Sequence, residues 1–205
     1  MRSKSSRNWL KEHFSDVYVK RAKHAGLRSR SVYKLLEIQE RYKIIRPNML
    51  VVDLGAAPGG WSEYVSGLVG NNGKIFAVDL LPMQPIAGVE FVQGDFTQDS
   101  VVNSLGARLG RKVDVVLSDL APNFSGVDVV DQAQMMHLGE KAMVLVQQVL
   151  KVGGVFLLKI FQGEGFEGFL QSLRHSFSKV KVMKPEASRS RSSEVYLLAK
   201  NFKGK

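Results

Sequence analysis

The sequence contains no cysteine among its 205 residues. Disulfide bridges, thiolate zinc sites and cysteine nucleophiles are therefore excluded, and a reducing compartment suits the composition. No apolar run approaches the roughly 18 residues that span a bilayer. The first 14 residues also lack the apolar core of a secretory signal, although their basic, Ser-rich character leaves an organelle transit peptide open. We therefore expect a cytoplasmic protein without a membrane segment.

Histidine is also scarce, and no metal site is predicted. The four histidines, at positions 13, 24, 137 and 175, have no spacing typical of metal ligands. The remaining composition, 44% hydrophobic and 23% charged, is that of an ordinary globular chain. A chain of this length forms a single domain with a sizeable core, which we assign to residues 1–205.

The net charge of +10 is distributed unevenly along the chain. Residues 1–46 hold 13 Lys/Arg against 4 Asp/Glu, residues 47–173 hold 7 against 13, and residues 174–205 hold 9 against 2. Two basic ends around an acidic middle indicate a polyanionic partner. A membrane surface would need a strong apolar helix face, which the first segment lacks, so nucleic acid is favoured. We interpret 1–46 as a basic, helical RNA-binding extension and 47–205 as the core.

Apolar runs alternate with helical patterns along the core. The first helix has Val32, Leu35, Leu36 and Ile38 on one face, with Ser29 or Ser31 as its cap. Strands are expected at 49–53, 74–79, 89–92, 113–119, 154–161, 179–183 and 194–199, and helices at 29–43, 61–69, 98–110, 130–150 (ended by 152–154) and 165–177. This alternation predicts an open α/β fold with a mostly parallel sheet and helices on both faces. The last two strands have no helix between them, which predicts an antiparallel hairpin at one edge.

Four acids follow predicted strands, namely Asp53, Asp79, Asp95 and Asp119. Each alone is best explained as a helix cap. Ligands of open α/β sheets bind beyond the carboxyl ends of the strands, so four acids there indicate a polar small molecule lying across the sheet. Asp79 also lies 24 residues after Gly55, close to the spacing at which an acid meets a ribose diol.

The loop after the first strand reads Asp-Leu-Gly-Ala-Ala-Pro-Gly-Gly-Trp over residues 53–61. Its glycines allow close approach of a ligand to the backbone. It differs from the G-x-G-x-x-G loop of dinucleotide sites, because Ala57 replaces a glycine and Pro58 removes an N–H donor. Pyrophosphate binding and a nicotinamide-dependent oxidoreductase are therefore disfavoured, and a nucleoside with a less demanding linker fits better.

Lys159 is unusual because it interrupts the apolar run Val-Phe-Leu-Leu-Lys-Ile-Phe over 155–161. A lysine on a buried strand is costly unless it is paired or faces a site. The alternative is a lysine whose side chain reaches solvent from the strand end.

Several motifs together resemble the FtsJ family of RNA 2′-O-methyltransferases. They are DLGAAPGGW at 53–61, SDLAPN at 118–123, the acids Asp79 and Asp95, and the flanking runs GLRSRSVYKLLEIQ, KIFQGEGF and SRSRSSEVYL. The resemblance covers nearly the whole chain in order. It implies a Rossmann-like S-adenosylmethionine-dependent methyltransferase fold, with the cofactor S-adenosylmethionine on the first four strands.

The resemblance also implies roles for single residues. Gly59 and Trp61 would line the methionine side, Asp79 would bind the ribose hydroxyls, and Asp95 the adenine amine. Asp119 would lie near the sulfonium, while Asp53 and Gly55 belong to the same cofactor loop. Packing of the indole between helix and sheet explains Trp61 equally well.

The family's Lys-Asp-Lys-Glu tetrad is matched here by Lys34, Asp119, Lys159 and Glu194. Judged alone, Lys34 is an ordinary solvated helix lysine and Glu194 a surface acid; the resemblance makes them catalytic candidates. In our hypothesis Lys159 takes the proton of the ribose hydroxyl, and Lys34 supplies charge that keeps Lys159 neutral. Asp119 and Glu194 would orient the two lysines.

The basic ends would hold the RNA through its phosphates. The candidate residues form two groups, Lys20, Arg21, Lys23, Arg28 and Arg30, and Lys179, Lys181, Lys184, Arg189 and Arg191. The resemblance implies that the substrate is a uridine of the large-subunit ribosomal RNA in the assembled subunit, and we expect the protein to act as a monomer. Transfer RNA or a messenger cap, or a non-enzymatic role in ribosome assembly, are the alternatives. A base methyltransferase is disfavoured because residues 119–123 lack the aromatic clamp that stacks a flipped base.

Overall fold

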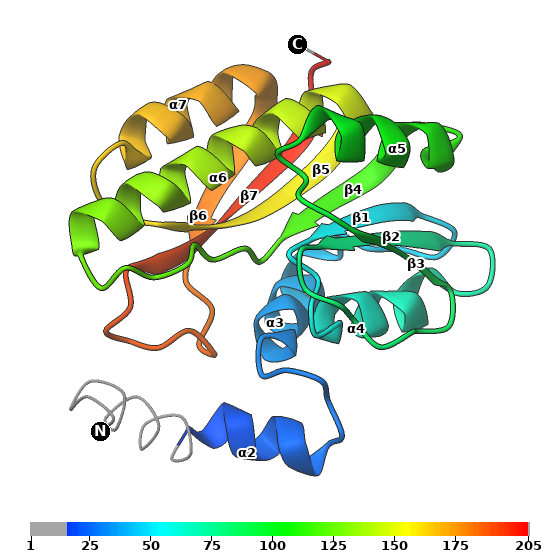
Figure 1. The fold of residues 1–205 in the computed structure, drawn as a ribbon, viewed down its shortest axis with the longest axis horizontal. Helices are drawn as coiled ribbons and strands as arrows, with labels where there is room; N and C mark the ends of the chain where they lie inside the picture. The colour runs from blue at the N-terminus through cyan, green and yellow to red at the C-terminus, as the bar shows by residue number, and fades with distance from the viewer. Residues whose placement is uncertain (1–15, 205) are drawn as a thin grey trace.

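A computed structural model describes residues 16–204 of the chain (Figure 1). The expectations for residues 1–15, which include His13 and the start of the basic extension, and for residue 205 lie outside the described residues. The helices are α2 (Val17–His24), α3 (Val32–Tyr42), α4 (Gly60–Val69), α5 (Asp99–Leu109), α6 (Asp128–Val149) and α7 (Phe166–Ser176). The strands are β1 (Leu50–Leu54), β2 (Lys74–Asp79), β3 (Val89–Gln93), β4 (Val113–Ser118), β5 (Leu150–Phe161), β6 (Phe177–Met183) and β7 (Glu194–Phe202).

The seven strands form one sheet in the order β3-β2-β1-β4-β5-β7-β6. Strands β1 to β5 are mutually parallel, whereas β7 is antiparallel to both of its neighbours, β5 and β6. The predicted α/β class and the antiparallel hairpin at the edge are therefore confirmed. The strand order reverses between β1 and β4, and at such a point the flanking connections leave in opposite directions and open a crevice above the strand ends.

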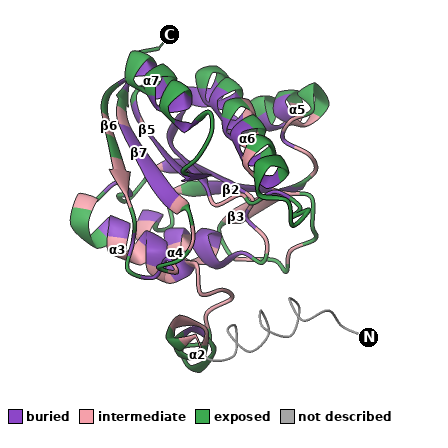
Figure 2. Cartoon of the chain, turned by 90° about the vertical axis from the view of Figure 1, so that its left-hand side faces the viewer, coloured by how far each residue is buried: buried purple, intermediate pink, exposed green. Residues whose placement is uncertain are grey.

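Helices cover both faces of the sheet (Figure 1). Helices α5, α6 and α7 pack on one face, in a core that includes Leu105, Met135 and Phe169. Helices α3 and α4 pack on the other, with Leu35, Trp61 and Val65. Figure 2 shows the resulting buried layer between exposed outer helix faces. Because both faces are covered, every residue of β1 is buried. This explains why all residues of the strand except Asp53 are apolar.

Two local expectations need correction. The run 152–154 was expected to end the long helix, but α6 ends at Val149 and β5 begins at once with Leu150. Val113 of β4 pairs with Leu150 of β5, and the next pair is Val115 with Val155. The strand β5 therefore has three extra residues between these pairs, in an irregular stretch that contains Gly153 and Gly154. Ser31 does occupy the N-cap of α3, but its side chain does not cap the helix, because its hydroxyl is hydrogen-bonded to the Ser29 hydroxyl.

Helix α2 lies in the segment that was interpreted as a helical extension, but its bounds were not predicted from the sequence. Asp16 caps it, accepting hydrogen bonds from the backbone N–H groups of Tyr18 and Val19. None of the helices in the described part of the chain has the length and apolar character needed to cross a membrane.

Candidate active site

The glycine loop, residues 54–60, runs from the end of β1 to the start of α4. Gly55 has φ +74°, and a Cβ there would lie 2.7 Å from Leu120 Cδ2. Gly59 has φ +103°, and its Cβ would lie 2.7 Å from Ile86 Cδ1 and 2.8 Å from Met83 Sδ. Both positions therefore favour glycine because of their backbone conformation, and at Gly55 the Leu120 Cα at 3.3 Å also limits the space for a Cβ.

Asp79 connects the glycine loop to the chain that follows β2. Its Oδ2 accepts the backbone N–H of Ala57 at 2.9 Å, and its Oδ1 accepts that of Leu81 at 2.8 Å. Asp95 holds the next turn, where its Oδ1 accepts both the N–H and the hydroxyl of Thr97. Asp79 and Asp95 therefore each hold the chain that follows their strand at the carboxyl end of the sheet.

Asp53 is 1% exposed and lies below the glycine loop on β1. The Ser62 hydroxyl donates to its Oδ2 at 2.7 Å, whereas its buried Oδ1 has no hydrogen-bond partner among the described residues. Burial raises the pKa of Asp53 to about 7, against the lowering effect of Ser62 and with a further contribution from the negative charges of Asp119 and Asp79. An unpartnered buried carboxylate oxygen suits a bound cationic group.

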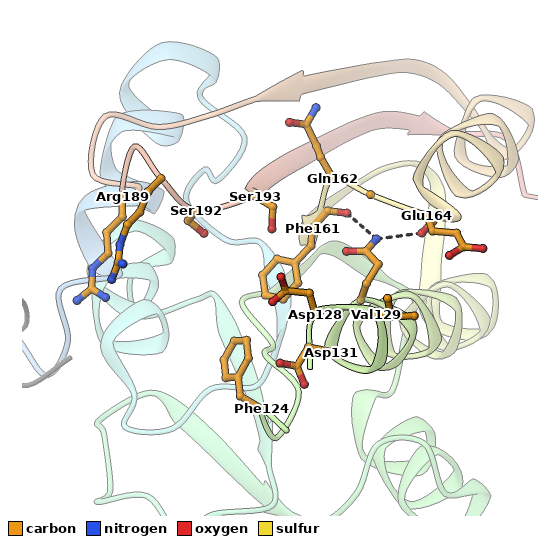
Figure 3. A pocket seen from close by; sticks show the side chains of 13 residues that line it. Phe124, Asp128, Val129, Asp131, Phe161, Gln162, Glu164, Arg189, Ser192 and Ser193 are labelled. Carbon is orange, nitrogen blue, oxygen red and sulfur yellow. Dashed lines mark hydrogen bonds between the residues drawn. The ribbon is translucent and has the colours of Figure 1, made fainter. Parts of the chain in front are cut away.

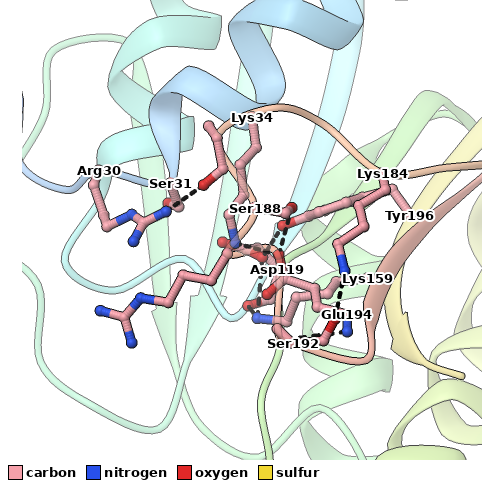
Figure 4. Close-up of polar contacts among 12 residues, drawn as sticks. Arg30, Ser31, Lys34, Asp119, Lys159, Lys184, Ser188, Ser192, Glu194 and Tyr196 are labelled. Atoms are coloured by element: carbon pink, nitrogen blue, oxygen red, sulfur yellow. Dashed lines mark hydrogen bonds and ion pairs between the residues drawn. The ribbon is translucent and has the colours of Figure 1, made fainter. Parts of the chain in front are cut away.

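Lys34, Asp119, Lys159 and Glu194 form what we call the lysine–carboxylate cluster (Figure 4). Lys159 Nζ lies 3.1 Å from Asp119 Oδ1 and donates a hydrogen bond to the Asp119 carbonyl oxygen at 3.0 Å. Lys34 Nζ donates to Glu194 Oε1 at 2.5 Å. The fold therefore brings together residues from α3, the end of β4, β5 and β7, and each lysine has its own carboxylate.

Both lysines of the cluster are buried, at 8% exposure for Lys34 and 7% for Lys159. Lys34 is therefore not the solvated lysine that its helix alone suggests, and Lys159 does not reach solvent from its strand end. Burial of a cation is costly unless it is paired, and the carboxylates provide that pairing. The cluster is a buried charged site and not a surface ion pair.

Asp119 carries the negative charge nearest to Lys159. Burial by itself would raise the pKa of Asp119, but the positive charges of Lys159 and Lys34 outweigh it, together with the hydrogen bond from Tyr196. The pKa is consequently held below its usual value, and the carboxylate stays ionised at neutral pH.

Tyr196 and Ser188 belong to this site and were missed by the sequence analysis. The Tyr196 hydroxyl donates to Asp119 Oδ1 at 2.6 Å, and the Ser188 hydroxyl donates to Glu194 Oε1 at 2.8 Å. Burial and then the charges of Asp119 and Glu194 raise the pKa of Tyr196 well above its usual value, so it remains a donor. One signal for Tyr196 was present, because it lies two residues after Glu194 on a predicted strand and therefore faces the same side.

The Trp61 side chain lies in the core and not in an open site. Its Nε1 donates to the Ser31 carbonyl at 2.9 Å, and its ring centroid lies 6.0 Å from that of Tyr196. The packing explanation therefore describes the indole. The backbone N–H of Trp61 lies in the first turn of α4, where helix amides are available to a ligand.

The two basic ends meet at Asp16. Asp16 is paired with Arg30, and its Oδ2 lies 3.5 Å from Arg189 Nε. Arg28 donates hydrogen bonds to the carbonyls of Gln84 at 3.0 Å and Pro85 at 3.2 Å, so this arginine serves the structure as well. The exposed members of the two groups are Lys20, Arg21, Lys23, Lys179, Lys181, Lys184 and Arg191.

Comparisons with known proteins show the family of this chain. The family model described as FtsJ-like methyltransferase matches residues 27–202. A ribosomal RNA large subunit methyltransferase E of Stutzerimonas stutzeri is 57% identical over 204 residues, 99% of each chain. The protein of the same name from Stenotrophomonas maltophilia is 55% identical over 198 residues, 96% of this chain and 94% of that one.

Solved structures share the fold. A ribosomal RNA methyltransferase from Plasmodium falciparum superposes with a TM-score of 0.78 at 29% identity, over 87% of this chain and 100% of that one. Aeropyrum pernix fibrillarin, solved with S-adenosyl-L-methionine, has a TM-score of 0.60 at 14% identity, over 84% of this chain and 74% of that one. The second similarity concerns the fold alone.

Proposed function

This chain belongs to the FtsJ-like methyltransferase family, and from that premise we propose that it transfers a methyl group from S-adenosylmethionine to a ribose 2′-hydroxyl of large-subunit ribosomal RNA. The observation that carries the proposal is the lysine–carboxylate cluster. A buried lysine held by an ionised carboxylate lies at the carboxyl end of the sheet, on the strand next to β4 and close to the glycine loop. Removal of a hydroxyl proton requires a base positioned in this way.

The residues around the glycine loop fit S-adenosylmethionine. When bound, the cofactor supplies a methyl group activated by a sulfonium charge. Asp53, with its unpartnered buried oxygen, suits the cofactor's ammonium group, and Asp79 at the end of β2 suits the ribose diol. The positive φ angles of Gly55 and Gly59 shape the turn that leads into α4, and the Trp61 N–H at the start of that helix suits the cofactor's carboxylate. Asp95, beyond β3, is assigned to the adenine amine.

In the reaction that we propose, Lys159 accepts the proton of the 2′-hydroxyl. S-adenosylmethionine, when bound, would supply the methyl group to the ribose oxygen and would leave as a neutral thioether, so the transfer balances with the hydroxyl proton on Lys159. The proton remains on Lys159 and then passes to solvent. Asp119 holds the Lys159 ammonium through Oδ1 and its carbonyl. A positioned base and an aligned nucleophile are each worth several orders of magnitude in rate.

Lys34 and Glu194 complete the cluster. The positive charge of Lys34 acts with that of Lys159 to lower the pKa of Asp119, so the carboxylate that holds Lys159 stays ionised. Glu194 holds Lys34 at 2.5 Å and is itself held by Ser188. We therefore assign Lys34, Asp119 and Glu194 to the same catalytic unit as Lys159.

The RNA substrate is assigned to the exposed members of the two basic groups, which would contact phosphates. A 2′-hydroxyl acceptor requires RNA, because DNA lacks the reacting group. We propose a uridine in the assembled large subunit as the acceptor. All four residues of the cluster come from one chain, so we propose that a monomer acts, and that it does so in the cytoplasm.

The test uses tritiated S-adenosylmethionine and large ribosomal subunits that lack the modification. We expect wild-type protein to transfer label, nuclease digestion to place the label on a 2′-O-methylated nucleoside, and Lys159→Ala to reduce the rate by at least about 100-fold. Lys74→Ala is the matched control, since Lys74 is an exposed lysine at the start of β2, paired with Glu90 on β3. Label on a base, or normal transfer by Lys159→Ala, would contradict the proposal. If transfer RNA is labelled and large subunits are not, the substrate is transfer RNA and not large-subunit ribosomal RNA.

A further inference from the structure

A cavity of about 910 Å³ is lined by residues close in the chain to members of the lysine–carboxylate cluster, and its lining contains neither the glycine loop nor the strand-end acids (Figure 3). Its walls come from three segments, 124–132, 161–164 and 189–193. Of the roles assigned above, only the phosphate contact of Arg191 involves a residue that lines this cavity. We call it the aromatic cavity, because two phenylalanines form part of its wall.

The rings of Phe124 and Phe161 are stacked, with centroids 6.0 Å apart and an angle of 23° between their planes. Phe161 is 8% exposed and Phe124 is 66% exposed, so Phe161 supports a ring that remains largely open to solvent. An isolated exposed apolar residue needs no explanation, but an aromatic ring held open within a cavity offers a surface on which a planar group can stack.

The start of helix α6 fixes both segments that carry these rings. Asp131 accepts hydrogen bonds from the N–H and the hydroxyl of Ser125, each at 2.7 Å. The Gln132 side chain donates to the carbonyls of Phe161 at 3.2 Å and Glu164 at 3.0 Å. Two consecutive helix residues therefore hold opposite walls, and the cavity is a built feature of the fold.

The aromatic cavity adjoins the proposed reaction centre. Phe161 follows Lys159 by two residues on β5 and is the register partner of Glu194 on β7. Phe124 follows Asp119 by five residues in the segment that leaves β4. A nucleotide whose 2′-hydroxyl reaches Lys159 therefore has the aromatic cavity within the reach of its own base.

Charge indicates how such a nucleotide is oriented. Arg189 and Arg191 line one side of the cavity, whereas Asp128 and Glu164 lie at the start of α6 and after β5 (Figure 3). Phosphates are attracted by the arginines and repelled by the acids. The RNA backbone is therefore expected along the 189–193 side, with the neutral base directed toward Phe124.

We propose that the aromatic cavity binds the unstacked base of the acceptor nucleotide, with Phe124 as its stacking platform. The inference rests on the proposed function and adds to it the group that receives the base. Bases of single-stranded RNA are commonly bound by stacking on aromatic side chains, which tolerates different bases. Phe124 would act by placing the ribose at Lys159 and not through any role in proton transfer.

The test compares Phe124→Ala, Phe124→Leu and Phe124→Tyr. Binding of a short fluorescein-labelled oligouridylate is measured at several salt concentrations with saturating S-adenosylhomocysteine, and methyl transfer is measured on undermodified large subunits. Val144→Ala is the matched control, because Val144 is a 50% exposed apolar residue on α6 outside the cavity. Arg191→Gln provides a contrast for phosphate contact.

We expect Phe124→Ala and Phe124→Leu to weaken oligouridylate binding and to lower kcat/KM by about 5- to 150-fold, the range for loss of one stacked base. Phe124→Tyr, which keeps the ring, should retain both properties. The salt dependence of binding should stay unchanged in the Phe124 variants and decrease by about one ion in Arg191→Gln. Thermal unfolding and cofactor titration of each variant show that the fold is intact.

Three results would overturn the site. The first is that Phe124→Ala binds oligouridylate and transfers methyl groups like wild type. The second is that Phe124→Leu equals Phe124→Tyr in both properties, which would indicate apolar contact without stacking. The third is that activity is lost on subunits while oligouridylate binding is unchanged, which would assign the cavity to a ribosomal protein. Failure of the proposed function is distinguishable. In that case wild-type protein methylates no ribose while its oligouridylate binding still depends on the Phe124 ring.

Discussion

The Tyr196 hydroxyl donates a hydrogen bond at 2.6 Å to Oδ1 of Asp119, the same oxygen that lies 3.1 Å from Lys159 Nζ. One carboxylate oxygen therefore joins a neutral donor from β7 to the proposed base on β5. Tyr196 is also the register partner of Lys159 in the β5–β7 ladder, so the arrangement follows from strand pairing. Tyr196 therefore orients Asp119 without taking part in proton transfer.

Tyr196→Phe should slow methyl transfer without preventing cofactor binding. A hydrogen bond to a charged group contributes about 1.5–3 kcal/mol, so we expect kcat to fall by roughly 10- to 150-fold. The pH dependence of kcat should also change, because Asp119 would be less well held beside Lys159. Tyr42→Phe is the control, since the buried Tyr42 hydroxyl has no hydrogen-bond partner among the described residues. Equal effects of the two substitutions would argue against a positioning role.

Asp53→Asn should stabilise the protein in a pH-dependent manner when no cofactor is present. The pKa of Asp53 is raised from 3.8 to about 7 by burial, so between these values the folded state binds more protons than the unfolded state. Stability of the wild type should therefore decrease as the pH rises through this window, by as much as about 4 kcal/mol from this group. The uncharged asparagine avoids this loss.

Thermal unfolding of wild type and Asp53→Asn from pH 4 to pH 8 provides the measurement. The difference in Tm should grow in favour of the variant as the pH increases and level off above about pH 7. If Tm changes with pH in the same way for the two proteins, burial does not raise the pKa of Asp53.

Asp79→Asn should weaken cofactor binding more than it weakens the fold. The amide keeps an acceptor for only one of the N–H groups of Ala57 and Leu81, turns an NH2 donor toward the other, and loses the charge that suits a ribose diol. We expect the Kd for S-adenosylmethionine to rise about 10- to 100-fold, which calorimetric titration measures. Asp99→Asn, an exposed acid in the first turn of α5, is the matched control. An unchanged Kd for Asp79→Asn would remove this residue from the cofactor site.

Gly59→Ala should be destabilising, because Gly59 has φ +103° and its added Cβ would collide with Ile86 and Met83. A left-handed backbone costs a non-glycine residue about 1–2 kcal/mol before any collision is counted. Gly67→Ala is the control, since a Cβ there meets no neighbour and should add roughly 0.5–1 kcal/mol of helix stability. Chemical denaturation of both variants decides the matter, and a neutral Gly59→Ala would show that the loop is not constrained at this position.

Local patterns in the sequence were sufficient for the order of the elements and for the glycine loop. Strand and helix periodicities depend on neighbouring residues, and the run 53–61 is contiguous in the chain. Lys159 was identified because an apolar run is interrupted within a few residues. The family and the fold followed from motifs of the same kind, and both are confirmed.

The chain by itself therefore determined the α/β fold, the family and the positions of the four residues that match its tetrad. Only the tertiary structure decided which residues share a site. Lys34 looks solvated on its own helix, and it is buried because α3 packs beside a strand that lies 160 residues later in the chain. The contact of Tyr196 with Asp119, the meeting of the basic ends at Asp16 and the stack of Phe124 on Phe161 likewise join distant segments. Such contacts depend on strand order and packing between layers, which local sequence patterns do not encode.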